Sequence, residues 1–229
     1  MAARVAVIIP AVNEEKSIGK VLKDIPWSLV EEVIVVDNGS QDNTGEEAQK
    51  HGATVLFEER RGYGQACLKG IDHLRTGNDT PDIVVFLDGD YSDYPDEMRD
   101  LIRPILDEDM DMVIGSRALG EREPGSMLPQ QVFGNWLATT LIRWLYGVTY
   151  SDLGPFRAIK YDKLLALGMV DTTYGWTVEM QVKAAKQNFA FKEIPVTYRK
   201  RIGKSKIAGT VSGTIGAGYK ILTTIGKYL

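Results

Sequence analysis

The sequence contains little cysteine and histidine, with one cysteine, Cys67, and two histidines among its 229 residues. A single cysteine excludes a disulfide within the chain, so we expect a reducing compartment and an inert Cys67 buried in a helix. His51 and His73 stand alone on helix patterns, without the ligand spacing of a zinc site. We therefore expect both histidines to have surface or core roles.

Long apolar runs are also absent. No stretch reaches the ~18 uninterrupted apolar residues of a membrane span, and the first apolar run is too short for a secretory signal and continues into a strand pattern. Hydrophobic residues make up 44% and charged residues 25% of the chain, which is ordinary for a globular protein. We expect one large cytoplasmic α/β domain, and peripheral association with a membrane stays open.

Acidic residues are missing from the C-terminal part of the chain. Residues 194–229 contain no Asp or Glu, and their seven basic residues are Arg199, Lys200, Arg201, Lys204, Lys206, Lys220 and Lys227. The rest carries 20 basic against 31 acidic residues, a balance of −11. This asymmetry predicts a basic edge that meets substrate phosphates, an anionic membrane surface or nucleic acid. Nucleic acid is not expected as a partner, because no recognised binding motif accompanies the charges.

Three apolar runs rich in β-branched residues end in polar or acidic residues. The runs are residues 4–9, 33–36 and 83–87, and the polar stretches after them are residues 10–15, 37–44 and 88–95. Such runs are typical of buried strands, and open α/β sheets bind ligands beyond the carboxyl ends of their strands. The pattern therefore predicts one shared cleft rather than three unrelated loops.

Asp88 and Asp90 are separated by one glycine at the end of the third run. Two carboxylates this close repel each other unless a cation lies beside them. Mg²⁺ takes one or two carboxylates together with substrate phosphates, so this pair predicts a metal–diphosphate site. An acidic turn without a metal is the alternative for this triplet taken alone.

Apolar runs and helix patterns alternate through the first half of the sequence. Expected strands are residues 4–9, 33–36, 54–57, 83–87 and 111–114, and expected helices are residues 16–24, 43–51, 61–74 and 95–107. This alternation predicts an α/β fold with a mostly parallel central sheet flanked by helices. The second half is less regular, with expected helices at 132–146 and 178–187 and expected strands at 155–159 and 191–196.

The segment 208–229 is a helix candidate weakened by four glycines, at residues 209, 213, 216 and 218. Each glycine costs a helix about 1 kcal/mol. The helix therefore needs support from the domain, from lipid at a membrane surface or from a partner protein, and the sequence leaves these alternatives open.

Several motifs taken in order resemble the inverting family 2 glycosyltransferases of the GT-A fold. They are IIPAVNEE at 8–15, VVDNGSQD at 35–42 and the Asp-x-Asp motif DGD at 88–90. The later motifs GSR at 115–117, DLGPFR at 152–157 and WTVEM at 176–180 are similar to the branch of dolichyl- and polyprenyl-phosphate mannose and glucose synthases. The resemblance covers roughly residues 4–206. It implies a single Rossmann-like catalytic domain over 1–206, with a nucleotide-sugar half at 1–115, an acceptor half at 116–206 and a basic helical tail at 207–229.

The resemblance also implies a nucleotide-sugar donor and a divalent metal, Mg²⁺ or Mn²⁺. Pro10, Glu14 and Asp37 match the positions around the base and ribose, and a carboxylate such as Asp37 can accept a ring N–H. Arg61 would lie near the phosphates, where Gly62 and Gly64 allow close backbone approach. Asp88 and Asp90 match the ribose- and metal-binding acids, with Asp90 the stronger metal ligand. The metal would neutralise the departing nucleoside diphosphate.

The implied acceptor is a polyprenyl phosphate, whose anionic oxygen needs no strong base. Its phosphate would be held by four basic side chains, Arg117, Arg199, Arg201 and Lys204. A hydroxyl acceptor would need a base, for which Asp152 and Glu179 are the candidates. A structural ion pair of Asp152 with Arg157 is the alternative.

One stretch departs from the lipid-phosphate branch. Residues 127–135 carry the amides Gln130 and Gln131 where that branch has arginines, which keeps a hydroxyl acceptor open. A catalytically silent subunit, which binds a nucleotide sugar and docks to a membrane partner, is a further alternative.

Overall fold

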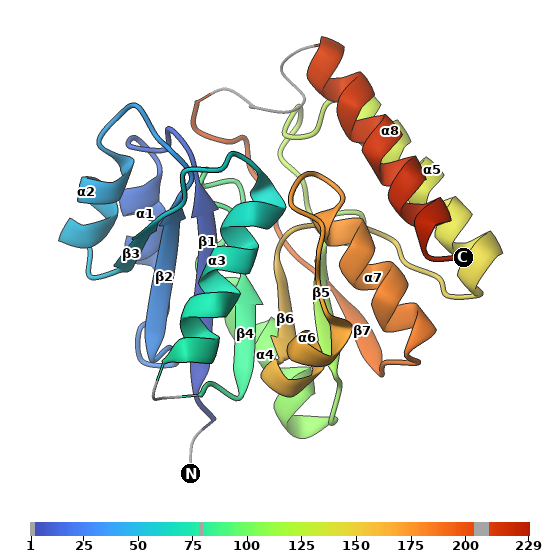
Figure 1. The fold of residues 1–229 in the computed structure, drawn as a ribbon, viewed down its shortest axis with the longest axis horizontal. Helices are drawn as coiled ribbons and strands as arrows, with labels where there is room; N and C mark the ends of the chain where they lie inside the picture. The colour runs from blue at the N-terminus through green and yellow to red at the C-terminus, as the bar shows by residue number, and fades with distance from the viewer. Residues whose placement is uncertain (1–2, 78–79, 204–210) are drawn as a thin grey trace.

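The computed structural model describes residues 3–77, 80–203 and 211–229. Its centre is a seven-stranded sheet in the order β3-β2-β1-β4-β6-β5-β7 (Figure 1). The strands are β1 (Val5–Ala11), β2 (Glu32–Asp37), β3 (Thr54–Phe57), β4 (Ile83–Phe86), β5 (Met112–Ser116), β6 (Arg157–Lys160) and β7 (Phe191–Pro195). All paired neighbours are parallel except that β6 runs antiparallel to β4 and β5. The expected α/β fold with a mostly parallel sheet is therefore confirmed.

Alternation along the strands divides the core into two layers. In β1 the side chains of Ala6 and Ile8 belong to one buried cluster, and those of Val5, Val7 and Ile9 to the other. Successive side chains of a strand point to opposite faces, so a strand covered on both sides is apolar throughout. This explains the unbroken apolar runs in the sequence.

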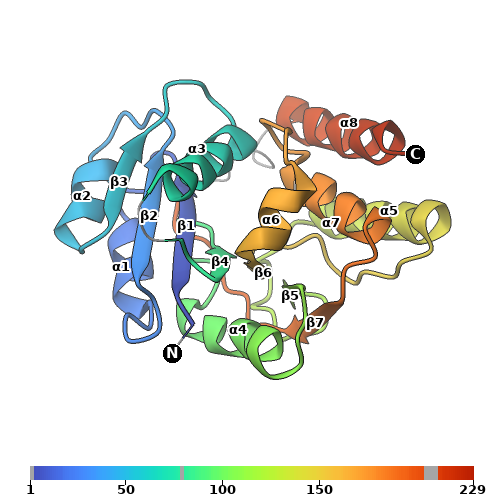
Figure 2. The ribbon, with the colours of Figure 1, turned by 60° about the horizontal axis from the view of Figure 1, so that its bottom comes forward.

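Helices cover both faces of the sheet. On one face lie α1 (Ile18–Asp24), α2 (Thr44–Lys50) and α4 (Met98–Asp107), the last preceded by the 3₁₀ turn Pro95–Glu97. On the other lie α3 (Tyr63–Thr76), α5 (Pro129–Tyr146), α6 (Tyr161–Leu167), α7 (Trp176–Lys186) and α8 (Val211–Lys227). Figure 2 shows α4 on the side of the sheet opposite α3, α6 and α7. The short helix α6 was not expected, because it follows β6 directly and has only seven residues.

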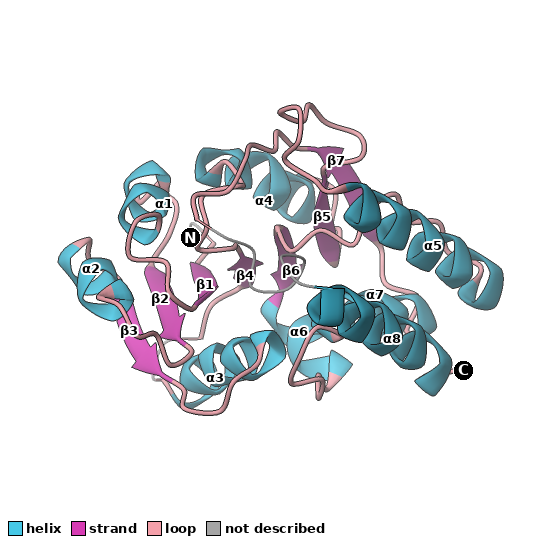
Figure 3. Ribbon diagram, turned by 90° about the horizontal axis from the view of Figure 1, so that it is seen from above, coloured by secondary structure: helices cyan, strands magenta, loops and turns pink. Residues whose placement is uncertain are grey.

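The C-terminal segment forms a helix that packs on the domain. In Figures 1 and 3, α8 runs alongside α5 and over α7. Residues of α8 contact residues of both helices. Ile225 is buried in the same cluster as the α5 and α7 core residues, and the Tyr146 hydroxyl donates to the Ile225 carbonyl. Tertiary packing thus supplies the support that the glycines of this helix require. Over the described residues, no helix combines the length and apolarity that crossing a bilayer demands.

Candidate active site

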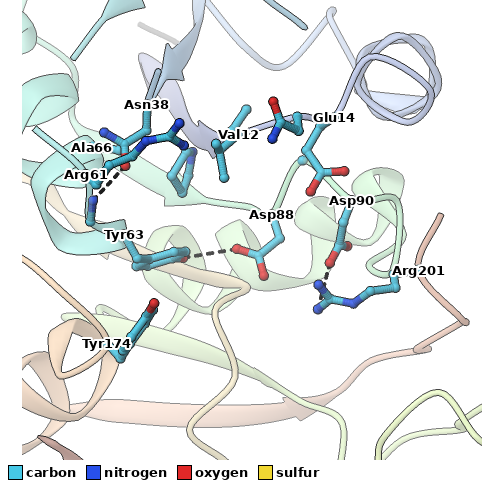
Figure 4. A pocket seen from close by; sticks show the side chains of 15 residues that line it. Val12, Glu14, Asn38, Arg61, Tyr63, Ala66, Asp88, Asp90, Tyr174 and Arg201 are labelled. Carbon is cyan, nitrogen blue, oxygen red and sulfur yellow. Dashed lines mark hydrogen bonds and ion pairs between the residues drawn. The ribbon is translucent and has the colours of Figure 1, made fainter. Parts of the chain in front are cut away.

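A pocket opens at the carboxyl ends of β1, β2 and β4 (Figure 4). Its volume is about 290 Å³, and its lining consists of residues 10–14, 38, 61–63, 66, 88–90, 174 and 201. The lining includes seven of the site residues expected from the sequence: Pro10, Glu14, Arg61, Gly62, Asp88, Asp90 and Arg201. The strand ends that were expected to share a cleft therefore do so.

Asp88 lies at the centre of this pocket beside Tyr63 (Figure 4). The Tyr63 hydroxyl donates to Asp88 Oδ1 at 3.1 Å. Burial, followed by the negative charge of Asp90, raises the pKa of the Asp88 carboxyl group to about 7. Asp88 is therefore partly protonated at neutral pH, and a bound cation would draw it into the carboxylate form.

Asp90 is held by a turn and by a distant arginine. Its Oδ1 accepts the Ser92 N–H at 2.9 Å and the Ser92 hydroxyl at 2.5 Å, and its Oδ2 lies 2.8 Å from Arg201 Nη2. Arg201 comes from the basic C-terminal part of the chain. A positive charge thus already accompanies the acid that was expected to bind metal most strongly.

Asp93 adds a third carboxyl group that the sequence reasoning did not single out. It is buried, and neither of its oxygens has a hydrogen-bond partner among the described residues. Burial raises the pKa of Asp93 well above its ordinary value, and Asp88 and Asp90 raise it further. The sequence places Asp93 three positions after the Asp-x-Asp motif, but it does not show that Asp93 is buried.

The residues present fit a divalent cation. Three carboxyl groups lie close together at one strand end, and a cation beside them would favour their ionised forms. In the parts of the chain that the structure describes, no three or more His, Cys, Asp or Glu side chains converge to hold a metal unaided. This agrees with an ion that takes one or two carboxylates and completes its shell with substrate phosphates and water.

Asn38 organises the side of the pocket that Arg61 and Gly62 line. Its side-chain N–H groups donate to the carbonyls of Glu58 and Arg60, at 3.0 and 2.8 Å, and its oxygen accepts the Gly62 N–H at 2.7 Å. Asn38 therefore fixes the loop that carries Arg61 into the pocket. Asp37, which was expected to contact the base, accepts the Ser40 N–H at 2.8 Å and is not among the lining residues.

The two glycines of this loop have a packing role. A Cβ on Gly62 would overlap the Thr172 carbonyl, and a Cβ on Gly64 would overlap the Asp171 carbonyl. The close backbone approach expected from these glycines is therefore made to another part of the chain, although Gly62 also lines the pocket. The segment that approaches them carries Tyr174, an aromatic lining residue that the sequence reasoning missed.

Arg117 and the buried Asp152 form a bidentate pair outside the pocket lining. Arg117 Nε and Nη2 lie 2.8 and 2.7 Å from the two carboxylate oxygens of Asp152, and the Arg117 N–H adds a third contact. Burial acts to raise the pKa of Asp152, but Arg117 lowers it below the ordinary value. Such a carboxylate is a weak base with both oxygens occupied. This geometry favours a structural role for both residues, and the partner of Asp152 is Arg117 rather than Arg157.

Glu179 lies beneath α8, away from the pocket lining, with its side chain fully buried. It accepts the N–H groups of Val170 and Asp171, the Tyr228 hydroxyl and the Lys183 ammonium. Burial acts to raise the pKa of Glu179, but these donors lower it. These contacts therefore favour a role for Glu179 in fixing the backbone, rather than a role as a base that accepts a proton from a substrate.

The remaining basic candidates are dispersed. The Arg199 guanidinium stacks on the rings of Tyr91 and Tyr94 and donates to the carbonyls of Tyr91 and Asp93, so it braces the turn after Asp90. Lys204 lies outside the described residues. In residues 127–135, where the sequence departs from the lipid-phosphate branch, the Gln131 side chain accepts the Leu128 N–H and caps the start of α5.

Residues 6–168 match the family described as glycosyl transferase family 2. The chain is 35% identical over 214 residues to an uncharacterised glycosyltransferase of Mycobacterium tuberculosis, covering 92% of this chain and 93% of the relative. It is 32% identical over 205 residues to a dolichyl-phosphate hexose transferase of Haloferax volcanii, covering 88% and 86%.

The fold is similar to that of glucosyl-3-phosphoglycerate synthase from Mycobacterium tuberculosis. The TM-score is 0.77 at 22% identity, covering 99% of this chain and 78% of the other. That structure contains Mn²⁺, uridine diphosphate and phosphoglyceric acid, and another structure of the same enzyme contains Mg²⁺ and uridine diphosphate. At this level of identity the likeness establishes the fold.

Proposed function

The chain belongs to glycosyl transferase family 2, and we propose that it moves a hexose, with inversion, from a nucleotide sugar to a polyprenyl phosphate at a membrane surface. The observation that carries the donor half is the pocket lined by Asp88, Asp90, Arg61 and Arg201, in which Asp90 pairs with Arg201 (Figure 4). Carboxylates for a cation and guanidinium groups for phosphate oxygens together suit a nucleoside diphosphate. The metal and uridine diphosphate bound by the similar enzyme support this reading.

The side chains of this pocket have distinct tasks in the proposed reaction. Asp88 and Asp90 would hold the divalent cation, which supplies charge neutralisation for the leaving diphosphate. Arg61 is positioned by the Asn38-bound loop to bind phosphate oxygens. Tyr63 holds the Asp88 carboxyl group in place, and Tyr174 supplies an aromatic wall. Catalysis then depends mainly on positioning, because a phosphate acceptor is already anionic.

The exposed surface of α5 supports a lipid acceptor. Val132, Phe133, Trp136 and Trp144 are between 42% and 76% exposed, and helical spacing aligns them in one stripe, the α5 apolar face. The exposed Arg143 lies on the same side. Tryptophan and arginine along an apolar stripe suit the boundary between lipid headgroups and acyl chains. The dolichyl-phosphate hexose transferase among the relatives points to the same acceptor class.

A two-stage experiment tests the proposal. Calorimetry with GDP- and UDP-sugars, with and without Mn²⁺, is expected to show metal-dependent binding of one donor. Transfer is then compared between a polyprenyl phosphate in vesicles and phosphoglyceric acid in solution. Transfer to the lipid alone supports the proposal, and transfer to phosphoglyceric acid alone would replace it with a hydroxyl-directed enzyme. Donor binding without transfer to either would favour a silent subunit.

A further inference from the structure

Lys220 of α8 and Tyr228, which directly follows α8, bond to two carboxylates that belong to or hold a segment reaching the pocket. Lys220 Nζ lies 2.9 Å from Asp171 Oδ2, and the Tyr228 hydroxyl donates to Glu179 Oε1 at 2.6 Å. Residues 170–175, which lie just before α7, are called the bridging segment below. Asp171, which pairs with Lys220, belongs to this segment, and Glu179, which accepts from Tyr228, holds it.

The bridging segment owes its backbone conformation to these two carboxylates. Glu179 accepts the N–H groups of Val170 and Asp171, at 3.1 and 2.7 Å. Asp171 Oδ1 accepts the Thr173 N–H at 2.7 Å. Each carboxylate therefore bonds to the segment with one set of contacts and to the C-terminal part of the chain, at Lys220 or Tyr228, with another.

The other side of the bridging segment bonds to the start of α3. The Gln65 N–H donates to the Thr172 carbonyl at 2.9 Å, and the Gly64 N–H donates to the Thr173 carbonyl at 3.2 Å. Helix α3 begins at Tyr63, which binds Asp88. Tyr174, within the segment, lines the same pocket, and Figure 4 shows it beside Tyr63.

Helix α8 packs closely on the bridging segment at Gly175. A Cβ on Gly175 would overlap the Asp171 carboxylate and lie 2.6 Å from the Thr224 hydroxyl of α8. Glu179, Asp171 and Thr224 are all buried. A hollow of about 280 Å³ lies beside this contact, lined in part by Asp171, Lys220 and Tyr228, so a shift of α8 would reach the segment through the named bonds and the Gly175 contact.

We propose that Tyr228 and Lys220 are positioning residues for the donor pocket. They hold the bridging segment through Glu179 and Asp171, and the segment in turn holds Tyr174 and the start of α3, which carries Tyr63. Only the identity of the ligand rests on the proposed function. The geometric coupling between α8 and the pocket stands on the contacts above.

Amide hydrogen exchange measures the coupling without any ligand. Tyr228→Phe removes one hydroxyl and is expected to speed exchange about tenfold in residues 170–176 and 62–66, the effect of losing one hydrogen bond to a charged group. Exchange in α4, on the opposite face of the sheet, is expected to stay unchanged. Tyr219→Phe is the matched control, because Tyr219 lies on α8 with its side chain 71% exposed.

Calorimetry with uridine and guanosine diphosphate plus Mn²⁺ then measures the affinity of the pocket for nucleotide. Tyr228→Phe and Lys220→Met are each expected to weaken binding about fivefold, as loosening of a positioned loop does, whereas Tyr219→Phe leaves the affinity unchanged. Unchanged exchange at 62–66, faster exchange at every site alike, or an unchanged dissociation constant would each overturn the proposal. If the wild-type chain binds neither nucleotide, the proposed function fails, while the exchange comparison still decides the coupling.

Discussion

Arg201 Nη2 lies 2.8 Å from Asp90 Oδ2, which joins the basic C-terminal part of the chain to the acidic end of β4. A main-chain bond reinforces the pair, because the Ile202 N–H donates to the Asp90 carbonyl at 2.9 Å. The guanidinium group therefore lies at the mouth of the pocket, where it balances the carboxylate charge. A bound diphosphate would offer Arg201 a second set of anionic oxygens.

Asp90→Ala is expected to abolish Mn²⁺-dependent nucleotide binding, because one of the two carboxylates for the cation is lost and Arg201 loses its partner. Calorimetry with the donor nucleotide measures this, and far-ultraviolet circular dichroism checks that the fold remains. Asp107→Ala is the control, since Asp107 is an exposed partner of Arg103. Donor affinity equal to that of the wild type would contradict the metal assignment.

Affinity for Mn²⁺ is expected to rise with pH around neutrality. The pKa of Asp88 is raised to about 7 by burial and by Asp90, so below that value a proton competes with the metal. The affinity should increase by up to about tenfold per pH unit below the pKa and level off above it. Titration of Mn²⁺ at saturating nucleotide at several pH values checks this. Asp88→Asn should remove the dependence of Mn²⁺ affinity on pH. A wild-type affinity that does not change with pH would contradict this prediction.

Asp152→Asn is expected to destabilise the fold by about 3–5 kcal/mol, because it leaves Arg117, whose side chain is only 12% exposed, without its carboxylate partner. Urea unfolding measures the free energy of unfolding. A double variant, Arg117→Gln with Asp152→Asn, should recover part of the loss, since it removes the uncompensated charge. If Asp152 were instead a catalytic base, the single variant would retain wild-type stability and lose only turnover.

Gly64→Ala is expected to lower the free energy of unfolding by about 1–3 kcal/mol, because the added methyl group meets the Asp171 carbonyl. Gly134→Ala provides the contrast within α5. Its Cβ would have nothing within 4 Å, so the better helix propensity of alanine should stabilise the protein by about 0.5–1 kcal/mol. Thermal or urea unfolding of both variants tests the pair, and effects of the same sign would refute the packing argument.

Trp136→Ser with Trp144→Ser is expected to weaken binding to anionic vesicles about tenfold, because it removes the two largest groups of the α5 apolar face. Cosedimentation with vesicles measures this, and nucleotide affinity in solution should stay unchanged. Leu106→Ser on α4, an apolar residue that is 56% exposed, serves as the control. Equal vesicle binding by the wild type, the double tryptophan variant and the Leu106→Ser control would contradict a membrane role of α5.

The amino-acid sequence determined the sheet and its acidic edge. Residues 33–36 and 83–87 are apolar without interruption because both faces of these strands are covered, so local composition alone marks them as buried strands. The strands and the acids after them adjoin in sequence, and parallel strands bring their carboxyl ends together. Asp88, Asp90 and Glu14 could therefore be expected in one cleft, and they line one pocket.

The tertiary structure alone decided which polar and charged groups pair. Asp152 pairs with Arg117, Arg201 with Asp90 and Tyr228 with Glu179, and no local pattern encodes these contacts between distant parts of the chain. The antiparallel insertion of β6 and the contact of Asp171 and Thr172 with Gly62 and Gly64 are of the same kind. A carboxylate in the sequence can act as a base, a metal ligand or an ion-pair partner. Only its burial and its neighbours after folding select among these roles, because they fix its pKa and occupy its oxygens.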